Sequence, residues 1–356
     1  MKIATIIGAR PQFIKASVVS SELQKKGIEE ILIHTGQHYD ENMSQVFFEE
    51  LKIPKPTYVF EIKERTHGAM TGEILKNCEK VLSSEKPDMV LIYGDTNSTL
   101  AGALAAVKLH IPIAHIEAGL RSFNHKMPEE INRILSDRIS TLLFCPTDIA
   151  VKNLADEGIT KGVFQVGDVM LDVALKFAKF ANKPNIDVED RFVLSTIHRA
   201  ENTDDEVRLR DIFEGLIEIS KRIPVILPLH PRTKKIVKTL NIKTNNLKIV
   251  EPVSFFEMIW LLKHCEMVFT DSGGLQKEAY FNQKPCVTLR DESEWVETIE
   301  NNYNILVGTK KAKIVESLQY RFNTNYSKKL YGDGDTSSLI VDEMVKCFSF
   351  AQKHQR

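Results

Sequence analysis

Short apolar runs recur along the chain, separated by longer segments with the periodicity of amphipathic helices. They occupy residues 2–8, 30–35, 88–94, 112–117 and 141–146, and then 192–197, 224–229, 247–251, 266–270 and 286–289. A run such as residues 89–93 is apolar on both faces, which a parallel strand covered by helices on each side requires. The pattern predicts repeated βα units that form two doubly wound parallel sheets.

Chain length supports two domains, because 356 residues exceed what a single hydrophobic core normally serves. A boundary is predicted near Gly167 and Asp168, between a strand-like segment at residues 163–166 and an amphipathic helix at residues 169–179. In open parallel sheets ligands bind beyond the carboxyl ends of the strands, so the chemistry is expected on strand-end loops.

Charge and cysteine content exclude several classes of function. Lys and Arg total 47 against 48 for Asp and Glu, so no overall field attracts nucleic acid or an anionic membrane. The five cysteines form no Cys-x-x-Cys pair and are expected to be reduced. No apolar stretch reaches the ~20 residues of a membrane span, and no basic leader precedes the first run. We therefore expect a cytoplasmic protein with no membrane or nucleic-acid partner.

Two cations follow the first apolar run. Gly8 and Ala9 form a predicted tight turn, and Pro11 suits the first turn of a helix. Arg10 and Lys15 place positive charge beside the free backbone N–H groups of that helix, which would suit a diphosphate. On these residues alone, a structural turn with surface charges fits equally well.

Carboxylates follow the next strands. Asp95 comes shortly after the run ending at Tyr93, Glu117 closes the following run, and Glu129 with Glu130 lies in a predicted first helical turn. Taken singly, each is typical of a helix N-cap or an ordinary helix start. Three acidic loops at one sheet edge would repel one another, and this raises carboxyl pKa values toward the range of general acid and base catalysis.

Anion-binding turns are expected in the second half. His198 stands where a strand ends and a helix begins, and Ser272-Gly273-Gly274 offers backbone donors to phosphate oxygens in the same setting. Glu278, about one helical turn further on, has a carboxylate suited to two ribose hydroxyls. Arg290 follows another strand. The simpler interpretations are a hydrogen-bonded loop histidine, a plain glycine turn and a surface arginine.

No cofactor is expected. The histidines are scattered, without His-Glu-x-x-His or a similar set of metal ligands. No Gly-x-Gly-x-x-Gly follows a strand, so the usual phosphate loop for a nicotinamide is also missing.

Taken together, these motifs resemble the non-hydrolysing UDP-N-acetylglucosamine 2-epimerases over nearly the whole chain. The resemblance rests on Gly8-Ala9-Arg10-Pro11, Gly94-Asp95-Thr96, His115-Ile116-Glu117-Ala118-Gly119-Leu120-Arg121, Pro128-Glu129-Glu130, His198-Arg199 and Asp271-Ser272-Gly273-Gly274. It implies two Rossmann-like domains facing across a cleft, the glycosyltransferase-B arrangement, in a homodimer. The N-terminal domain would span residues 1–167 and the UDP-binding domain residues 168–335, and a final helix at residues 336–356 would cross back.

Within the family, the closest likeness is to enzymes acting on UDP-2,3-diacetamido-2,3-dideoxyglucuronic acid. Their motifs resemble residues 10–15 and 294–297, where parent enzymes usually show Pro-Glu and Arg-Pro-Glu. Residues 37–43 depart from the Gln-His-Arg type of segment in bacterial enzymes that substrate activates allosterically, which argues against such activation here.

The resemblance implies removal and return of UDP through a 2-acetamidoglucal, in the synthesis of surface polysaccharide such as lipopolysaccharide. Proton transfer and its tuning would belong to Asp95, Glu117 and Glu129, with His198 as a further catalytic residue. Substrate binding would involve Arg10, Lys15, Arg121, Arg133, Ser272, Gly273, Gly274, Glu278 and Arg290, with no metal.

Two rival functions use the same substrate class. A glycosyltransferase of the same build would need an acceptor site and gives no reason for three converging acidic loops. A hydrolysing 2-epimerase would resemble Gly-Thr-Arg-Ala-x-Tyr at the first turn, whereas this chain has Gly8-Ala9-Arg10-Pro11 and Lys15.

Overall fold

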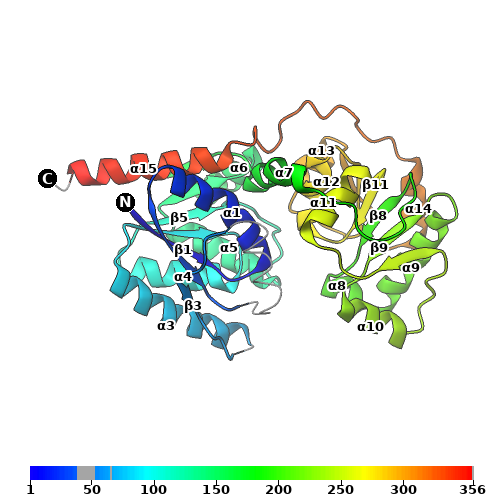
Figure 1. The fold of residues 1–356 in the computed structure, drawn as a ribbon, viewed down its shortest axis with the longest axis horizontal. Helices are drawn as coiled ribbons and strands as arrows, with labels where there is room; N and C mark the ends of the chain where they lie inside the picture. Colours follow the sequence, from blue (N-terminus) through cyan, green and yellow to red (C-terminus); the bar gives the residue numbers. More distant parts are fainter. Residues whose placement is uncertain (38–52, 65, 355–356) are drawn as a thin grey trace. The chain divides into compact units, whose positions relative to one another are not determined.

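The computed structural model describes residues 1–37, 53–64 and 66–354, with side chains up to residue 350. The segment compared with allosterically activated relatives therefore lies outside the described residues from position 38 onward. Contacts divide the chain into two compact units (Figure 1). Unit 1 comprises Met1–Val173 and Tyr331–Arg356, and unit 2 comprises Ala174–Leu330.

Unit 1 is built on a seven-stranded sheet with the order β3-β2-β1-β4-β5-β6-β7, in which every neighbouring pair is parallel. The strands are β1 (Lys2–Ile7), β2 (Glu29–His34), β3 (Tyr58–Val59), β4 (Met89–Tyr93), β5 (Ile113–Ile116), β6 (Leu142–Cys145) and β7 (Val163–Gln165). The order reverses direction beside β1, which puts consecutive crossover helices on opposite faces of the sheet.

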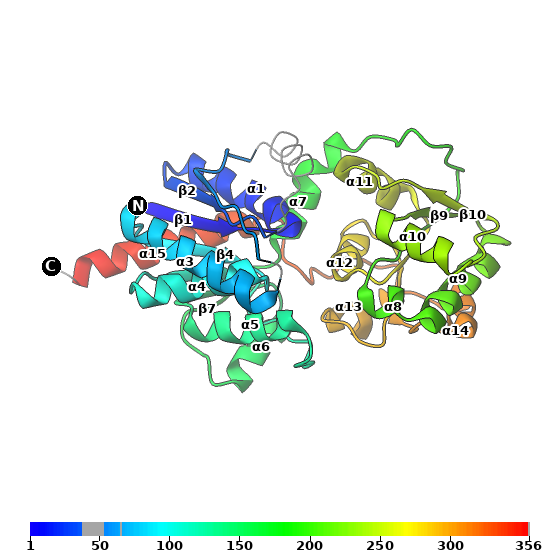
Figure 2. The same cartoon turned by 90° about the horizontal axis from the view of Figure 1, so that it is seen from below.

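Helices cover both faces of this sheet (Figures 1 and 2). They are α1 (Arg10–Lys25), α3 (His67–Glu85), α4 (Asn97–Lys108), α5 (Pro128–Ile139), α6 (Asp148–Asp156) and α15 (Thr336–His354). Helix α7 (Val169–Phe177) begins in unit 1 and ends in unit 2. Small residues let α4 approach β1 closely: a Cβ added at Gly102 would lie only 2.6 Å from the Ile6 side chain. Ile6, Val90 and Ile92 are fully buried in the resulting core.

The final helix belongs to unit 1, although unit 2 precedes it in sequence. α15 packs against α1, and Lys26 forms an ion pair with Asp342. At its start, the buried Asp172 carboxylate of α7 accepts hydrogen bonds from the backbone N–H groups of Thr336 and Ser337, at 3.2 and 2.7 Å. The domain boundaries expected at residues 167 and 335 stay a prediction. The contacts themselves divide the chain a few residues away, and residues 168–173 and 331–335 group with unit 1.

Unit 2 has a six-stranded parallel sheet with the order β10-β9-β8-β11-β12-β13. Its strands are β8 (Val193–Thr196), β9 (Val225–Pro228), β10 (Leu247–Val250), β11 (Met267–Thr270), β12 (Cys286–Thr288) and β13 (Asn304–Leu306). Its helices are α8 (Ala200–Thr203), α9 (Glu206–Ser220), α10 (Pro231–Thr239), α11 (Phe255–His264), α12 (Gly273–Phe281), α13 (Val296–Glu300) and α14 (Lys311–Glu316), and short 3₁₀ turns occupy Ala178–Phe180 and Ser317–Gln319.

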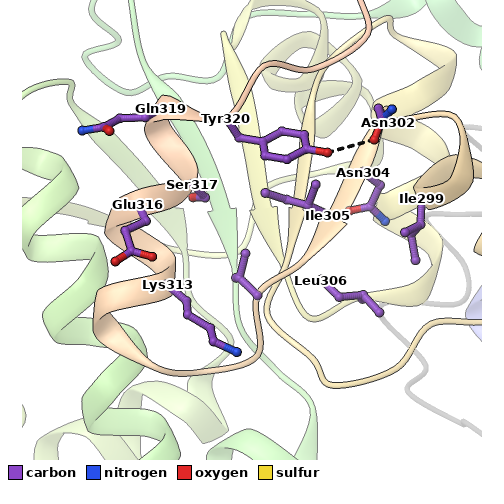
Figure 3. Close-up of a pocket in the computed structure, with 11 residues that line it drawn as sticks. Ile299, Asn302, Asn304, Ile305, Leu306, Lys313, Glu316, Ser317, Gln319 and Tyr320 are labelled. Carbon is purple, nitrogen blue, oxygen red and sulfur yellow. Dashed lines mark hydrogen bonds between the residues drawn. The ribbon is translucent and has the colours of Figure 1, made fainter.

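A cavity of about 720 Å³ lies beside the edge strand β13 of unit 2. Figure 3 shows Tyr320 on its wall, with its hydroxyl donating to the Asn302 side-chain oxygen at 2.8 Å. Lys313 and Glu316 line it from α14. None of the candidate site residues lines this cavity.

The predicted fold class of two Rossmann-like domains is confirmed, since every predicted strand is present. The sequence pattern missed β3 and β13, which have two and three residues and are too short to show a periodicity. Among the helices of the described chain, none has the length and apolarity to cross a bilayer.

Candidate active site

Gln12 connects two turns at the edge of unit 1 where the strands have their carboxyl ends. Its side-chain oxygen accepts the backbone N–H groups of Gly8 and Ala9, at 2.7 and 3.0 Å. Its side-chain nitrogen donates to the carbonyl of Tyr93 at 2.8 Å and to the hydroxyl of Thr96 at 3.0 Å. One buried amide therefore joins the turn before Arg10 to the turn that carries Asp95.

Lys15 and Glu117 meet in this edge. Lys15, from the second turn of α1, forms an ion pair with Glu117, and their side chains are 9% and 11% exposed. The backbone of Glu117 is left-handed, with φ of 71°, a conformation that costs energy for a side chain of this size. A Cβ added at Gly94 would lie 3.2 Å from the Glu117 carboxylate, so Glu117 reaches the turn that precedes Asp95.

Asp95 is held by two residues of α5. Arg133 donates to its carboxylate at 2.6 Å, and the side chain of Asn132 donates to its backbone carbonyl at 2.9 Å. Arg133 also donates to the buried carboxylate of Glu130, at 2.8 Å. The Asp95 side chain remains 31% exposed, and it is therefore both fixed and accessible.

Glu130 anchors the loop between Glu117 and Glu129. Its carboxylate accepts the backbone N–H groups of Ser122 and Phe123, each at 2.9 Å. Burial opposes ionisation of Glu130, but these N–H groups and Arg133 outweigh it, so that the pKa lies below its usual value. Phe123 is held in a left-handed conformation with φ of 58° and is 74% exposed.

Glu129 lies in the first turn of α5 and is half-buried. Within the described part of the chain its carboxylate makes no hydrogen bond or ion pair, unlike those of Asp95 and Glu117. The exposed Arg10 begins α1. The structure thus brings Asp95, Glu117 and Lys15 to one sheet edge and places Glu129 at the start of the adjacent helix.

Arg121 is placed differently from the other predicted substrate-binding residues. Its guanidinium donates to both carboxylate oxygens of Glu157, at 2.6 and 2.8 Å, and to Asp137 at 2.7 Å. The side chain is 1% exposed. These contacts describe a structural role, and substrate binding by Arg121 stays a prediction.

In unit 2, a single buried carboxylate organises the strand ends. Asp271 follows β11 and is fully buried. It accepts the backbone N–H groups of His198 at 3.0 Å and Arg199 at 3.1 Å, and the side-chain amide of Asn202 at 3.1 Å. The turn after β8 is therefore fixed to the turn after β11.

The His198 ring remains accessible above this turn. Its side chain is 49% exposed, and its Nδ1 lies 3.5 Å from the Asp271 carboxylate. Partial burial lowers the pKa of His198, Arg199 and His230 lower it further, and the negative charge of Asp271 opposes them. The balance favours a neutral imidazole, which can donate one hydrogen bond without carrying charge.

The start of α12 is open to an anion. The Ser272 side chain caps the helix, accepting the backbone N–H of Leu275 at 3.4 Å. A Cβ added at Gly273 would have the guanidinium of Arg199 at 3.4 Å, the Glu294 carboxylate at 3.7 Å and the indole nitrogen of Trp295 at 3.8 Å, whereas one at Gly274 would meet nothing within 4 Å. A free helix N-terminus with a guanidinium beside it suits a phosphate group.

Two further predicted residues lie on nearby elements of unit 2. Glu278 is half-buried in α12. Arg290 is 1% exposed and pairs with Glu294 at 3.1 and 3.2 Å. Burial and pairing give Arg290 a structural role in holding the segment before α13, and direct contact with substrate stays a prediction for it.

Several residues that shape these edges were not predicted as site residues: Gln12, Glu130, Asn132, Asn202 and Asp271. Each acts on backbone groups or on another side chain, so no spacing in the sequence distinguishes it from an ordinary polar residue. Glu130 and Asp271 do belong to two of the motifs quoted above, next to the predicted site residues Glu129 and Ser272. That position is the signal that could have identified them. In the described residues, no group of three or more His, Cys, Asp or Glu side chains could hold a metal ion.

Comparison with known proteins identifies the family. A sequence profile described as UDP-N-acetylglucosamine 2-epimerase matches residues 21–345. This chain belongs to that family. The UDP-2,3-diacetamido-2,3-dideoxy-D-glucuronate 2-epimerase of Pseudomonas aeruginosa is 55% identical over 354 residues, covering 97% of this chain and 100% of the relative. The UDP-N-acetylglucosamine 2-epimerase of Methanocaldococcus jannaschii is 46% identical, covering 96% and 98%.

Solved structures agree with this assignment. The crystal structure of the Methanocaldococcus jannaschii UDP-GlcNAc 2-epimerase in complex with UDP-GlcNAc and UDP matches with a TM-score of 0.90 and 45% identity, over 97% of this chain and 100% of that one. The Neisseria meningitidis enzyme bound to UDP-GlcNAc matches with a TM-score of 0.88 and 31% identity, over 97% and 100%. The chain is thus an isomerase, a UDP-sugar 2-epimerase of the non-hydrolysing type, and neither rival function is favoured.

Proposed function

We propose that the protein inverts C2 of UDP-2,3-diacetamido-2,3-dideoxyglucuronic acid. The proposal is supported by the Pseudomonas aeruginosa relative, which is named for this reaction and is 55% identical over its whole length. Relatives named for UDP-N-acetylglucosamine, from Methanocaldococcus jannaschii and Neisseria meningitidis, are 46% and 33% identical. UDP-N-acetylglucosamine is the second candidate, since it carries the same 2-acetamido group.

The chemistry requires an indirect route, because the C2 proton of a 2-acetamido sugar has no neighbouring carbonyl to acidify it. Cleavage of the C1–O bond ahead of proton loss gives C1 oxocarbenium character. A base then removes the C2 proton, the C1–C2 double bond forms, and the C1–O electron pair leaves with UDP. Protonation of the opposite face of C2, with return of the UDP oxygen to C1, completes the inversion.

We assign the proton transfers to the carboxylates of unit 1. The observation that carries the assignment is the placement of Asp95 and Glu117 at one sheet edge, each against a cation. Arg133 lies 2.6 Å from Asp95, and Lys15 pairs with Glu117. Each cation fixes the position of its carboxylate, and a positioned carboxylate is what proton transfer at C2 requires. Glu129, at the start of the adjacent helix, is the third member of the set.

UDP recognition is assigned to unit 2, with Arg10 and Lys15 as the contribution of unit 1. The α12 N-terminus with Ser272, Gly273 and Gly274 would bind a phosphate, and His198 would donate a hydrogen bond to the diphosphate as it gains charge. Glu278 would accept the ribose hydroxyls. Each contact to the leaving diphosphate strengthens as the C1–O bond breaks, which lowers the barrier more than it stabilises bound substrate.

The test is an exchange experiment in deuterated water. Purified protein, without added metal or nicotinamide, is incubated with each of the two UDP-sugars separately and with both together, and C2 and free UDP are followed by proton NMR. Deuterium at C2 of a manno-configured product is the expected result, and the sugar that turns over faster identifies the substrate. Absence of exchange with both sugars would contradict the proposal.

We also infer a homodimer, working in the cytoplasm on precursors of a surface polysaccharide such as lipopolysaccharide. Two apolar side chains on successive turns of α5, Ile131 and Leu135, are 46% and 45% exposed, and such a stripe suits a second copy of the chain. The cysteines are all free, which agrees with a reducing compartment. Light scattering of the wild type and of Ile131→Glu would test the dimer, which is expected to dissociate in the variant.

A further inference from the structure

An ionic cluster lies beneath the unit 1 edge, buried except for Glu157, whose side chain is 33% exposed. It consists of His115 on β5, Asp137 on α5, Arg121 and Glu157, and is called the His115 cluster below. His115 Nδ1 lies 2.7 Å from the Asp137 carboxylate, and Nε2 lies 2.8 Å from the carbonyl oxygen of Gly94. The side chains of His115 and Asp137 are both 0% exposed.

The two hydrogen-bond partners of the His115 ring indicate how many protons it carries. A neutral imidazole has one N–H donor and one acceptor nitrogen. The carbonyl of Gly94 can only accept, and so can an ionised Asp137. Both ring nitrogens therefore need a proton for the two short contacts to be attractive. A neutral ring would leave a lone pair facing an oxygen in a fully buried position.

The alternative, a neutral ring with a protonated Asp137, is disfavoured by the other partners of that carboxylate. Arg121 donates to Asp137 at 2.7 Å, and the backbone N–H of Gly119 donates to it at 3.1 Å. Burial opposes ionisation of Asp137, but His115 and Arg121 outweigh it and hold its pKa below the usual value. The other titratable neighbour, Cys145 on β6, stays a neutral thiol because burial and Asp137 raise its pKa to about 12.

The charges of the His115 cluster then sum to zero. His115 and Arg121 carry one positive charge each, and Asp137 and Glu157 one negative charge each. Arg121 closes the set by donating to both oxygens of Glu157 at 2.6 and 2.8 Å. Balanced and fully hydrogen-bonded charges are the form in which ions persist inside a protein.

The cluster connects all three segments that carry the proposed catalytic carboxylates. The Gly94 carbonyl that His115 binds belongs to the left-handed residue preceding Asp95. His115 itself stands two residues before Glu117 on the same chain segment, and Asp137 lies in the helix that begins next to Glu129. The N–H of Gly94 also donates to the carbonyl of Ile116, at 2.9 Å. Both the N–H and the carbonyl of Gly94 are therefore hydrogen-bonded to residues of β5.

We propose that His115 is doubly protonated in the folded enzyme and serves as a positioning residue, which ties the turn carrying Asp95 to the segments carrying Glu117 and Glu129. The catalytic part of this proposal rests on the proposed epimerase function. The charge state does not, because it follows from contacts within unit 1 alone.

The charge state is tested by NMR on the full chain with ¹⁵N-labelled histidine rings. The signal of His115 is assigned by its loss in His115→Gln. Both ring nitrogens of His115 are expected to carry a proton in the folded protein, because each faces an acceptor oxygen. The exposed His110 provides an internal reference ring. A ring nitrogen of His115 without a proton at neutral pH would overturn the proposal.

The positioning role is tested with Asp137→Asn, which keeps an acceptor for His115 but removes the anion that requires the second proton. We expect kcat to fall about 10- to 100-fold, with KM for the UDP-sugar within about threefold, since small misplacements of reacting groups have effects of this size. We also expect a larger share of turnovers to end in released glycal and UDP, because the protonating group is no longer aligned.

The matched control is Glu30→Gln, which alters a half-buried carboxyl elsewhere in unit 1. Glu30 binds Thr5 and Ser20, and burial raises its pKa despite both hydrogen bonds. This variant is expected to lose some thermal stability and to keep the wild-type product ratio. An equal release of glycal by both variants, or none by Asp137→Asn, would contradict the positioning role. If the wild type epimerises neither UDP-sugar, the proposed function fails, whereas the NMR result still decides the charge of His115.

Discussion

The two units hold their strand ends by different means. In unit 1, charged side chains meet charged side chains, as Lys15 does with Glu117 and Arg133 with Asp95. In unit 2, backbone N–H groups gather around the buried Asp271 carboxylate, and the start of α12 is left open. Paired side chains can exchange protons, whereas fixed N–H groups bind an anion without changing their own protonation. The difference supports the proposal that proton transfer belongs to unit 1 and most of the anion binding to unit 2.

The largest effect is expected for Asp95→Asn, which tests whether proton transfer takes place in unit 1. The amide keeps the size of the side chain but cannot accept the C2 proton. We expect the rate of C2 deuterium exchange to fall about 10³-fold, within the range that a positioned acid or base contributes. UDP affinity, measured by calorimetry, should change less than about threefold because Asp95 is assigned to proton transfer and not to UDP binding.

The control for Asp95→Asn is Asp88→Asn. Asp88 accepts the backbone N–H of Lys2 at 2.7 Å, at the opposite end of β4, and should leave exchange unchanged. Full activity in Asp95→Asn would remove Asp95 from the mechanism and end the assignment of proton transfer to this edge.

Acidification should destabilise unit 1 through His34. This residue ends β2 and is 2% exposed, and burial lowers its pKa to about 4. In the unfolded chain a histidine pKa is about 6.5, so between these values the unfolded state binds a proton that the folded state does not. The free energy of unfolding should therefore fall as pH drops from about 6.5 to about 4, by up to about 3 kcal/mol.

The measurement separates the two units by their optical signals. Both tryptophans, Trp260 and Trp295, lie in unit 2, so their fluorescence reports that unit, while far-ultraviolet circular dichroism reports both. His34→Gln should flatten the pH dependence of the dichroism transition, and the exposed-residue control His110→Asn should not. A pH dependence that survives in His34→Gln would locate its source elsewhere.

Loss of the buried Asp271 carboxylate in unit 2 should weaken UDP binding more than it slows C2 exchange. Asp271→Asn leaves the N–H groups of His198 and Arg199 facing an amide that competes with them as a donor. We expect the Kd for UDP to rise about 10- to 100-fold, the effect of losing hydrogen bonds to a buried charge. C2 exchange at saturating UDP-sugar should fall much less.

Asp204→Asn provides the comparison for that variant. Asp204 is exposed and pairs with Arg232 on the surface of unit 2. Its loss should not change UDP affinity, and an unchanged affinity in Asp271→Asn as well would show that the turn after β8 does not bind the diphosphate.

The smallest effect is expected for Gly273→Ala. The added methyl group would lie 3.4 Å from the end of the Arg199 side chain, which can shift, so thermal stability should hardly change. The same methyl group would obstruct a phosphate approaching the backbone, and KM should rise about tenfold, equivalent to about 1.4 kcal/mol. Gly72→Ala, in an open part of α3, is the control for the substitution itself. A wild-type KM in Gly273→Ala would place the phosphates elsewhere.

The sequence predicted the strands well because fully buried parallel strands read as continuous apolar runs. It predicted Asp95, Glu117 and the turn at Ser272 for a related reason, since polar residues directly after such runs must lie at the carboxyl edge. It did not predict that Arg121 and Arg290 would be buried against Glu157 and Glu294. Glu157 lies 36 positions from Arg121, and Glu294 lies 4 positions from Arg290. Three-dimensional packing decides which carboxylate each arginine meets, and a single sequence carries no signal for that.

Helix α15 also has a consequence for the order in which the protein is made. Because the Asp172 carboxylate accepts hydrogen bonds from Thr336 and Ser337, and α15 packs on α1, unit 1 needs residues that are made after unit 2. Unit 2 is contiguous and can be complete earlier, although it starts later in the sequence. Domains usually fold in the order of their synthesis. Here the part of α1 that packs against α15 stays uncovered until the residues after unit 2 have been made.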